Sequence, residues 1–101
     1  MIKHIVLFKL ADEAEGNSKA TNAVMIKQRL EALKGLIPEI LKMEVSINHA
    51  DAPAGNHDIV LDSEFRSLDD LHTYISHPEH QKVAAFIGKV RTGRAAIDYE
   101  F

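Results

Sequence analysis

The stretch IKHIVLFKL, residues 2–10, decides the predicted fold, because its apolar residues recur at every second position. One side of this stretch carries Ile2, His4, Val6, Phe8 and Leu10. A period of two residues is typical of a β-strand, whose neighbouring side chains point to opposite faces of a sheet. The other side still carries Ile5 and Leu7 between two lysines, so we expect both faces of this strand to be covered.

The rest of the chain alternates between helical and strand-like spacing. Ser18 is suited to cap a helix that runs to about residue 36, with an apolar stripe on Ala23, Ile26, Leu30, Leu33 and Ile37. Alternation predicts strands over residues 42–48, 57–65 and 95–101. Residues 11–17 are polar and are predicted to form a loop, and the run from Asn48 to Asn56 is a second, longer loop.

Two more helices are predicted between the third and fourth strands. Ser67 is a good first cap, and the apolar face of that helix is predicted to consist of Leu68, Leu71 and Ile75. Pro78 suits the first position of the next helix, because the N–H that proline lacks would have no partner at that position. Gly93 is predicted to end this helix. Its apolar stripe is Val83, Phe86, Ile87 and Val90.

The order β-α-β-β-(αα)-β predicts an α+β fold, the ferredoxin-like plait: a four-stranded antiparallel sheet with helices on one face. A single domain accounts for residues 1–101. The face without helices would expose Ile5, Leu7 and Val60, so we expect a homodimer that pairs sheet to sheet through them. The alternative is a monomer with three scattered apolar surface residues.

The composition of the chain argues against several classes of function. The 101 residues include 12 Lys and Arg against 15 Asp and Glu, no Cys and no Trp, and the net charge is −3. These values argue against binding to nucleic acid and exclude thiolate chemistry and disulfides. No stretch approaches the roughly 20 apolar residues of a membrane-spanning helix, and no signal peptide is apparent, so we expect a cytoplasmic protein that does not bind membranes.

His80 is the main catalytic candidate. It lies in the first turn of the helix that opens at Pro78, where the positive end of the helix dipole disfavours an imidazolium and favours the neutral imidazole of a general base. His4 lies on the strand side that we expect to face the helices. Both histidines also have structural interpretations: His80 can bond a backbone carbonyl in the turn, and His4 can be a satisfied core residue.

Other polar groups point less clearly to chemistry. His72, His77 and His80 lie on either side of a helix break, so we expect no metal and no cofactor. Asp58, Asp62 and Glu64 share a strand face and are interpreted as a solvated or intersubunit edge. Arg91 and Arg94 are interpreted as neutralising a helix end rather than binding phosphate.

The chain resembles the stress-responsive dimeric α/β-barrel family, Dabb, over essentially its whole length. The matching pieces are MIKHIVLFKL (1–10), IPEI (37–40), HDIVL (57–61), EFRS (64–67), YISHPEH (74–80) and IDY (97–99). The run YISHPEH is the most specific of them. The resemblance implies a ferredoxin-like subunit that pairs into a barrel-like dimer, with a cavity between the helices and the sheet of each subunit.

The polyketide cyclases of this family suggest roles for single residues. By resemblance, His80 is the catalytic base, Tyr74 is its hydroxyl partner, and His4 contacts the substrate. Phe8, on the same strand face as His4, and Ile59 are also predicted to contact the substrate. The cyclases have a further pocket histidine where this chain has Ile59, which puts the cyclase reaction itself in doubt. Tyr74 alternatively is a half-buried core residue with a hydrated hydroxyl.

Three functions follow from these residues. The first is a cofactor-independent, cyclase- or lyase-like enzyme that binds a small, largely apolar carbonyl compound. The second is a non-catalytic homodimer that serves as a small-ligand-binding or stress-associated module. The third, by analogy of fold alone, is a small cofactor-free monooxygenase.

Overall fold

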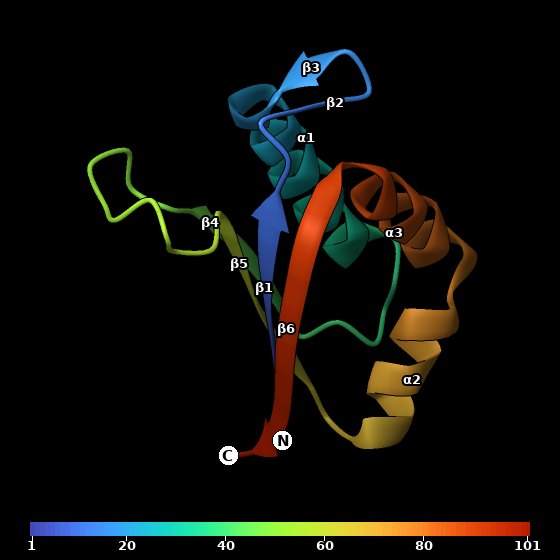
Figure 1. Ribbon diagram of the computed structural model, residues 1–101. Helices are drawn as coiled ribbons and strands as arrows, with labels where there is room; N and C mark the ends of the chain where they lie inside the picture. The colour runs from blue at the N-terminus through green and yellow to red at the C-terminus, as the bar shows by residue number, and fades with distance from the viewer.

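The structure, a computed structural model that describes residues 1–101, contains a four-stranded antiparallel sheet with its helices on one face (Figure 1). The larger elements are β1 (Ile2–Leu10), α1 (Lys19–Ala32), β4 (Lys42–Ile47), β5 (Ile59–Phe65), α2 (Leu68–Ser76), α3 (Pro78–Val90) and β6 (Arg91–Glu100). The strands lie in the order β4-β5-β1-β6, and each neighbouring pair is antiparallel. The predicted ferredoxin-like α+β plait is thus confirmed.

The predicted loop over residues 11–17 instead contains a small hairpin. Its two strands are β2 (Glu13–Ala14) and β3 (Asn17–Ser18). Glu15 and Gly16 form the turn with φ angles of 52° and 77°, the left-handed conformation that a two-residue hairpin turn of type I′ requires at both central positions. Ser18 then caps α1 by accepting a hydrogen bond from the Thr21 N–H, as the sequence predicts.

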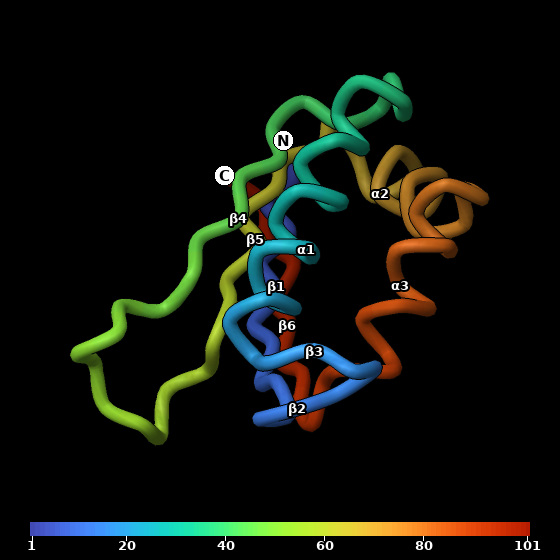
Figure 2. The backbone as a smooth tube through the Cα atoms, turned by 90° about the horizontal axis from the view of Figure 1, so that it is seen from above, coloured from blue at the N-terminus to red at the C-terminus, as the bar shows by residue number.

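The hydrophobic core lies between the sheet and the helices. β1 is its central strand, and the side predicted to face the helices is buried along the whole strand. The predicted stripe of α1 is also buried in full and continues through the short 3-10 helix η1 (Leu33–Gly35). α1 packs along β4 and touches α3, so the helices form one layer on this side (Figure 2).

A substitution at Leu33 tests whether the apolar stripe of α1 and η1 is buried. Its side chain is 2 % exposed, whereas Leu36, one turn further on, is 55 % exposed. We expect Leu33→Ala to lower the free energy of unfolding by roughly 2–5 kcal/mol, because it leaves a cavity in the core. Denaturant melts measure this loss, and Leu36→Ala is the matched control with an expected change below about 0.5 kcal/mol. Equal effects of the two variants would contradict the assigned packing.

The predicted apolar face of α2 is confirmed at Leu71 and wrong at Leu68 and Ile75. Leu68 and Ile75 are 51 % and 41 % exposed, while Tyr74 is 0 % exposed. The helix is therefore rotated so that Leu71 and Tyr74, three residues apart, face the core. The bulk of the tyrosine ring explains the rotation, since it packs against Phe65 with 5.1 Å between the ring centroids.

Gly93 has a different role from the one predicted. α3 ends at Val90, and Gly93 lies inside β6 opposite Lys9. The register of β1 and β6 shifts between Lys9 and Leu10, and a Cβ atom on Gly93 would lie 3.3 Å from Cβ of Lys9. Glycine therefore allows the close approach of the two strands beside this irregularity.

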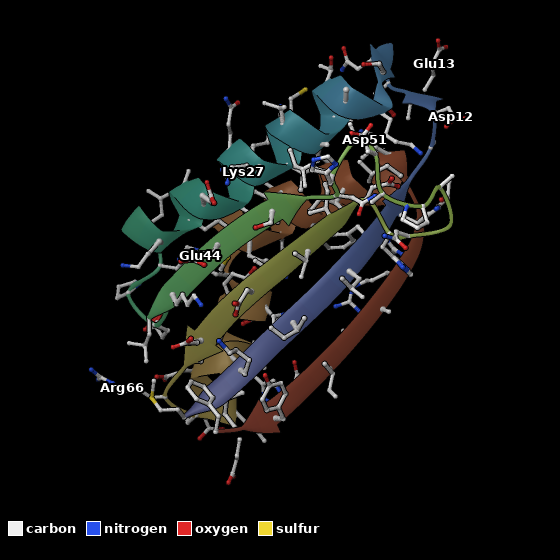
Figure 3. All side chains as sticks on the ribbon, turned by 90° about the vertical axis from the view of Figure 1, so that its left-hand side faces the viewer. Asp12, Glu13, Lys27, Glu44, Asp51 and Arg66 are labelled. Carbon is white, nitrogen blue, oxygen red and sulfur yellow. The ribbon has the colours of Figure 1, made fainter.

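The opposite face of the sheet carries no helix (Figure 3). The register places Leu7 beside Val60 of β5 and Ala95 of β6, and Ile5 beside Ile97, on this open face. The loop between β4 and β5 extends away from the sheet on the side opposite α2 and α3, as Figures 1 and 2 show. No helix of the protein combines the length and the apolar character that crossing a bilayer requires.

Candidate functional site

A cavity of about 230 Å³ lies between the sheet and the helices, where the sequence predicts a site. Its lining comes from β1, α1, β5, α2, α3 and β6, and consists of His4, Val6, Phe8, Leu30, Leu61, Tyr74, His80, Ala84, Ile87, Arg91 and Arg94. Two larger hollows, of about 470 and 510 Å³, border the loop between β4 and β5 and contain neither histidine candidate.

Tyr74 reaches the cavity from the inner face of α2. Its ring centroid lies 4.4 Å from that of His80 and 6.4 Å from that of His4, so the three rings form one cluster. The residue is fully buried rather than half-buried, and its hydroxyl has no hydrogen-bond partner. Burial raises the pKa of this phenol, against an opposing effect of the Arg94 charge, so the group is a neutral O–H donor.

The junction of α2 and α3 fixes the orientation of His80. The His77 side chain caps α3 by accepting from the Glu79 N–H, and Pro78 follows at the first helical position. Nδ1 of His80 lies 2.8 Å from the carbonyl oxygen of Ile75. Since a carbonyl only accepts, Nδ1 carries the proton, and Nε2 keeps its lone pair and has no protein partner in the structure.

Burial lowers the pKa of His80 below its usual value, and the nearby charges of His4, Arg94 and His77 act in the same direction. The bond to Ile75 opposes them. The folded protein therefore holds a neutral imidazole. As the pH falls below about 6.5, the unfolded chain takes up a proton first, and this residue's contribution to stability is lost as the pH passes down through the lowered pKa.

Arg94→Gln is expected to raise the pKa of His80, because it removes a positive charge that disfavours the imidazolium. The measurement is an NMR titration of the histidine ring signals, with assignment by His80→Gln. Arg66→Gln is the control, since Arg66 lies in the connection between β5 and α2, outside the cavity (Figure 3). An unchanged or lower pKa in Arg94→Gln would show that the guanidinium does not act on the imidazole.

His4 lies on the helix-facing side of β1, as predicted, and is buried. The register pairs it with Asp98 of β6, and its Nδ1 lies 2.5 Å from a carboxylate oxygen of that residue. The carboxylate accepts from the Nδ1–H of His4, and this bond fixes the orientation of the imidazole ring in the cavity. Two imidazoles thus line one cavity, each with Nδ1 held from behind.

Of the other residues predicted for the site, some line this cavity and others lie elsewhere in the fold. Phe8 lines the cavity, whereas Ile59 lies outside it and borders the hollow of about 470 Å³. No cluster of three or more His, Asp or Glu side chains is placed to hold a metal ion together. Asp58, predicted to share an edge with Asp62, instead accepts a hydrogen bond of 2.7 Å from the Leu10 N–H.

Sequence reasoning missed Arg91 and Arg94 as residues of the site. Arg91 does follow the end of α3, where a cation suits the helix dipole, but both arginines line the cavity. The prediction that these arginines neutralise a helix end uses only the residues next to them in the sequence. Only the pairing of β6 with β1, which places Arg94 opposite Phe8, reveals that its side chain lies on the helix-facing side of the sheet.

The protein thus combines a ferredoxin-like sheet with a small cavity that His4, Tyr74 and His80 line. A sequence model of the stress responsive A/B barrel domain matches residues 2–101. The chain therefore belongs to the stress-responsive A/B barrel (Dabb) family, as its sequence motifs predict.

Individual relatives agree with this family. An uncharacterised protein of Streptomyces coelicolor is 34% identical over 101 residues, which cover 100% of both chains. A stress-response A/B barrel domain-containing protein of Arabidopsis thaliana is 35% identical over 83 residues, covering 82% of this chain and 30% of the plant protein. The chain thus corresponds to less than a third of that plant protein.

Solved structures share the fold. A protein of unknown function from Bacteroides fragilis, described as dimeric and ferredoxin-like, is 40% identical with a TM-score of 0.88, covering 99% of this chain and 95% of that one. Hydroxynitrile lyase from Passiflora edulis is 16% identical with a TM-score of 0.79, covering 97% and 90%. An antibiotic biosynthesis monooxygenase is 12% identical with a TM-score of 0.77, covering 100% and 98%. The two enzymes indicate the fold alone.

Proposed function

We propose that this protein is a cofactor-independent, cyclase- or lyase-like enzyme that acts on a small carbonyl compound. The observation that carries the proposal is the buried, unpartnered hydroxyl of Tyr74 beside a neutral His80 whose Nε2 is free. A buried donor without a partner is costly, so a small movement of the ring that lets a ligand oxygen accept from this hydroxyl is favoured. The cavity of about 230 Å³ lies below the usual range of about 300–1,000 Å³, which limits the ligand to a small molecule.

The proposed reaction begins with the carbonyl oxygen of the ligand accepting a hydrogen bond from Tyr74. Nε2 of His80 then takes a proton from the carbon next to the carbonyl, and the electron pair of that C–H bond moves into the enolate. The phenol stabilises the negative charge that develops on the oxygen. Apolar side chains of the lining, such as Val6 and Leu61, surround the place of this step.

Exchange of the methyl protons of acetophenone in D₂O tests this proposal without knowledge of the natural substrate. The base removes a proton, the enolate takes up a deuteron, and the methyl signal in the ¹H NMR spectrum declines. We expect the protein to accelerate exchange above the buffer rate and to shift the ring signals of His80 and Tyr74. A ligand that shifts these signals without exchange would instead support the non-catalytic ligand-binding module.

We also propose that the protein is a homodimer that pairs through the open face of the sheet. Ile5, Leu7 and Val60 form its apolar centre, and Ile97 extends this centre with a side chain that is 60 % exposed in the single chain. Contact of such an exposed apolar patch with a second apolar surface is favourable, because it removes both from water. The dimer described for the related Bacteroides fragilis protein supports this assignment.

Charged groups lie beside this apolar centre. The ion pairs join Lys3 and Lys42 to Asp62 and Glu64, with N···O distances of 2.7–3.7 Å. All four side chains are exposed by a third or less. Because the opposite charges are already paired within one chain, this part of the face can approach a second copy without leaving an isolated charge.

A further inference from the structure

Two arginines give the cavity a permanent positive charge. The lining contains Arg91 and Arg94 but no Asp or Glu. None of the ion pairs within the chain involves an arginine, so neither guanidinium has a carboxylate partner. Asp98, the acidic residue nearest in register, is already held by His4.

The polar groups lie at different depths of this cavity. His4 and Tyr74 are buried, whereas Arg91 and Arg94 are exposed residues of the edge strand β6. Apolar side chains such as Leu61 and Ile87 complete the wall. A ligand that fits this distribution has an apolar body, a hydrogen-bond acceptor at its buried end and an anionic group at the end near β6.

The arginine charge also reaches the reacting groups. The positive charge of Arg94 contributes to the lowered pKa of the His80 imidazole and opposes the rise that burial causes in the pKa of the Tyr74 phenol. Arg94 lines the same cavity as both groups, so its guanidinium is placed to contact a ligand that binds beside them. Its planar fork of N–H donors matches the two oxygens of a carboxylate.

We propose that the cavity selects a small carbonyl compound that carries a carboxylate, with the carbonyl oxygen at Tyr74 and the carboxylate at Arg91 and Arg94. This inference rests on the proposed function and names its substrate class. It also changes the expectation from the sequence, since a largely apolar ligand would make no use of the two guanidinium groups.

Matched ketones test the proposal. Acetophenone, 3-acetylbenzoate and 4-acetylbenzoate share the ring and the acetyl group, and only the latter two carry a carboxylate, at two different positions. NMR titration of the full chain gives the dissociation constant of each ligand from the His80 and Tyr74 ring signals. We expect at least one acetylbenzoate to bind about tenfold or more tightly than acetophenone at low salt. This preference should decline at high salt, where charges are screened.

Arginine variants assign the preference to the two guanidinium groups. Arg94→Gln and Arg91→Gln should each reduce the preference for the carboxylate, and the double variant should remove it while acetophenone still binds. Arg66→Gln, outside the cavity, should retain the full preference.

Two results would overturn the inference. The first is acetophenone binding as tightly as both acetylbenzoates, which would leave the proposed enzyme intact with a neutral substrate. The second is an undiminished preference in the double variant. If no ketone shifts the His80 and Tyr74 signals, the proposed function fails together with the inference.

Discussion

Replacing His80 by glutamine is expected to reduce the protein-catalysed exchange of ketone α-protons by about 10²–10⁴-fold, the usual contribution of a positioned general base. Glutamine keeps a polar side chain of similar reach, but it provides no basic nitrogen. The measurement is the initial rate of deuterium incorporation into acetophenone or into an acetylbenzoate that binds. His72→Gln is the matched control, because His72 is exposed on α2 and does not line the cavity.

The variant Tyr74→Phe distinguishes a catalytic role of the Tyr74 hydroxyl from a role in stability. The phenylalanine ring preserves the packing against Phe65 and His80, and the hydroxyl that it removes has no partner in the folded protein. We therefore expect the free energy of unfolding to stay the same or to increase, while the exchange rate falls because the enolate oxygen loses its donor. Exchange at the wild-type rate in both His80→Gln and Tyr74→Phe would remove this pair from the mechanism.

The second large effect is expected at the open face of the sheet. Leu7→Asp places a carboxylate between Val60 and Ala95, at the centre of the proposed interface. In one chain Leu7 is only half-buried, so an aspartate there can remain hydrated. Between two sheets it would be buried without a partner, at a cost of several kcal/mol, which is enough to shift the protein to a monomer.

Light scattering and analytical ultracentrifugation measure this shift, and circular dichroism reports whether the variant is folded. Val24→Asp is the control, because Val24 is 46 % exposed on α1, on the other side of the sheet. The control should keep the mass of the wild type. A Leu7→Asp protein that retains the wild-type mass, or a wild type that is itself a monomer, would show that the open face is not the interface.

Much of the fold follows from local patterns. The alternation in residues 2–10 predicts β1 and its buried side, because a central strand shows its two faces directly in the sequence. The helix α2 is harder to predict, since Leu68, Leu71 and Ile75 form as regular a stripe as Leu71 and Tyr74. Which stripe is buried depends on how the Tyr74 ring fits against Phe65, and that contact involves another element.

The candidate site, like the fold, can be predicted from local sequence only in part. His80 and Tyr74 lie six residues apart in one motif, so the sequence brings them to attention together. Arg94 lies in a different element and looks like a charge near a helix end. Its place in the cavity depends on the register of β6 against β1, which the local sequence of residues 91–94 does not provide.

The hydrogen bond of 3.2 Å from the Phe101 N–H to the Met1 carbonyl places the two ends of the chain side by side (Figure 1). A domain with adjacent ends can be inserted into a longer polypeptide without separating its strands. The same proximity would allow a short peptide to join residues 101 and 1, with new ends opened in the protruding loop between β4 and β5. Circular permutation is therefore a practical way to move the chain ends to this loop and to attach a reporter there.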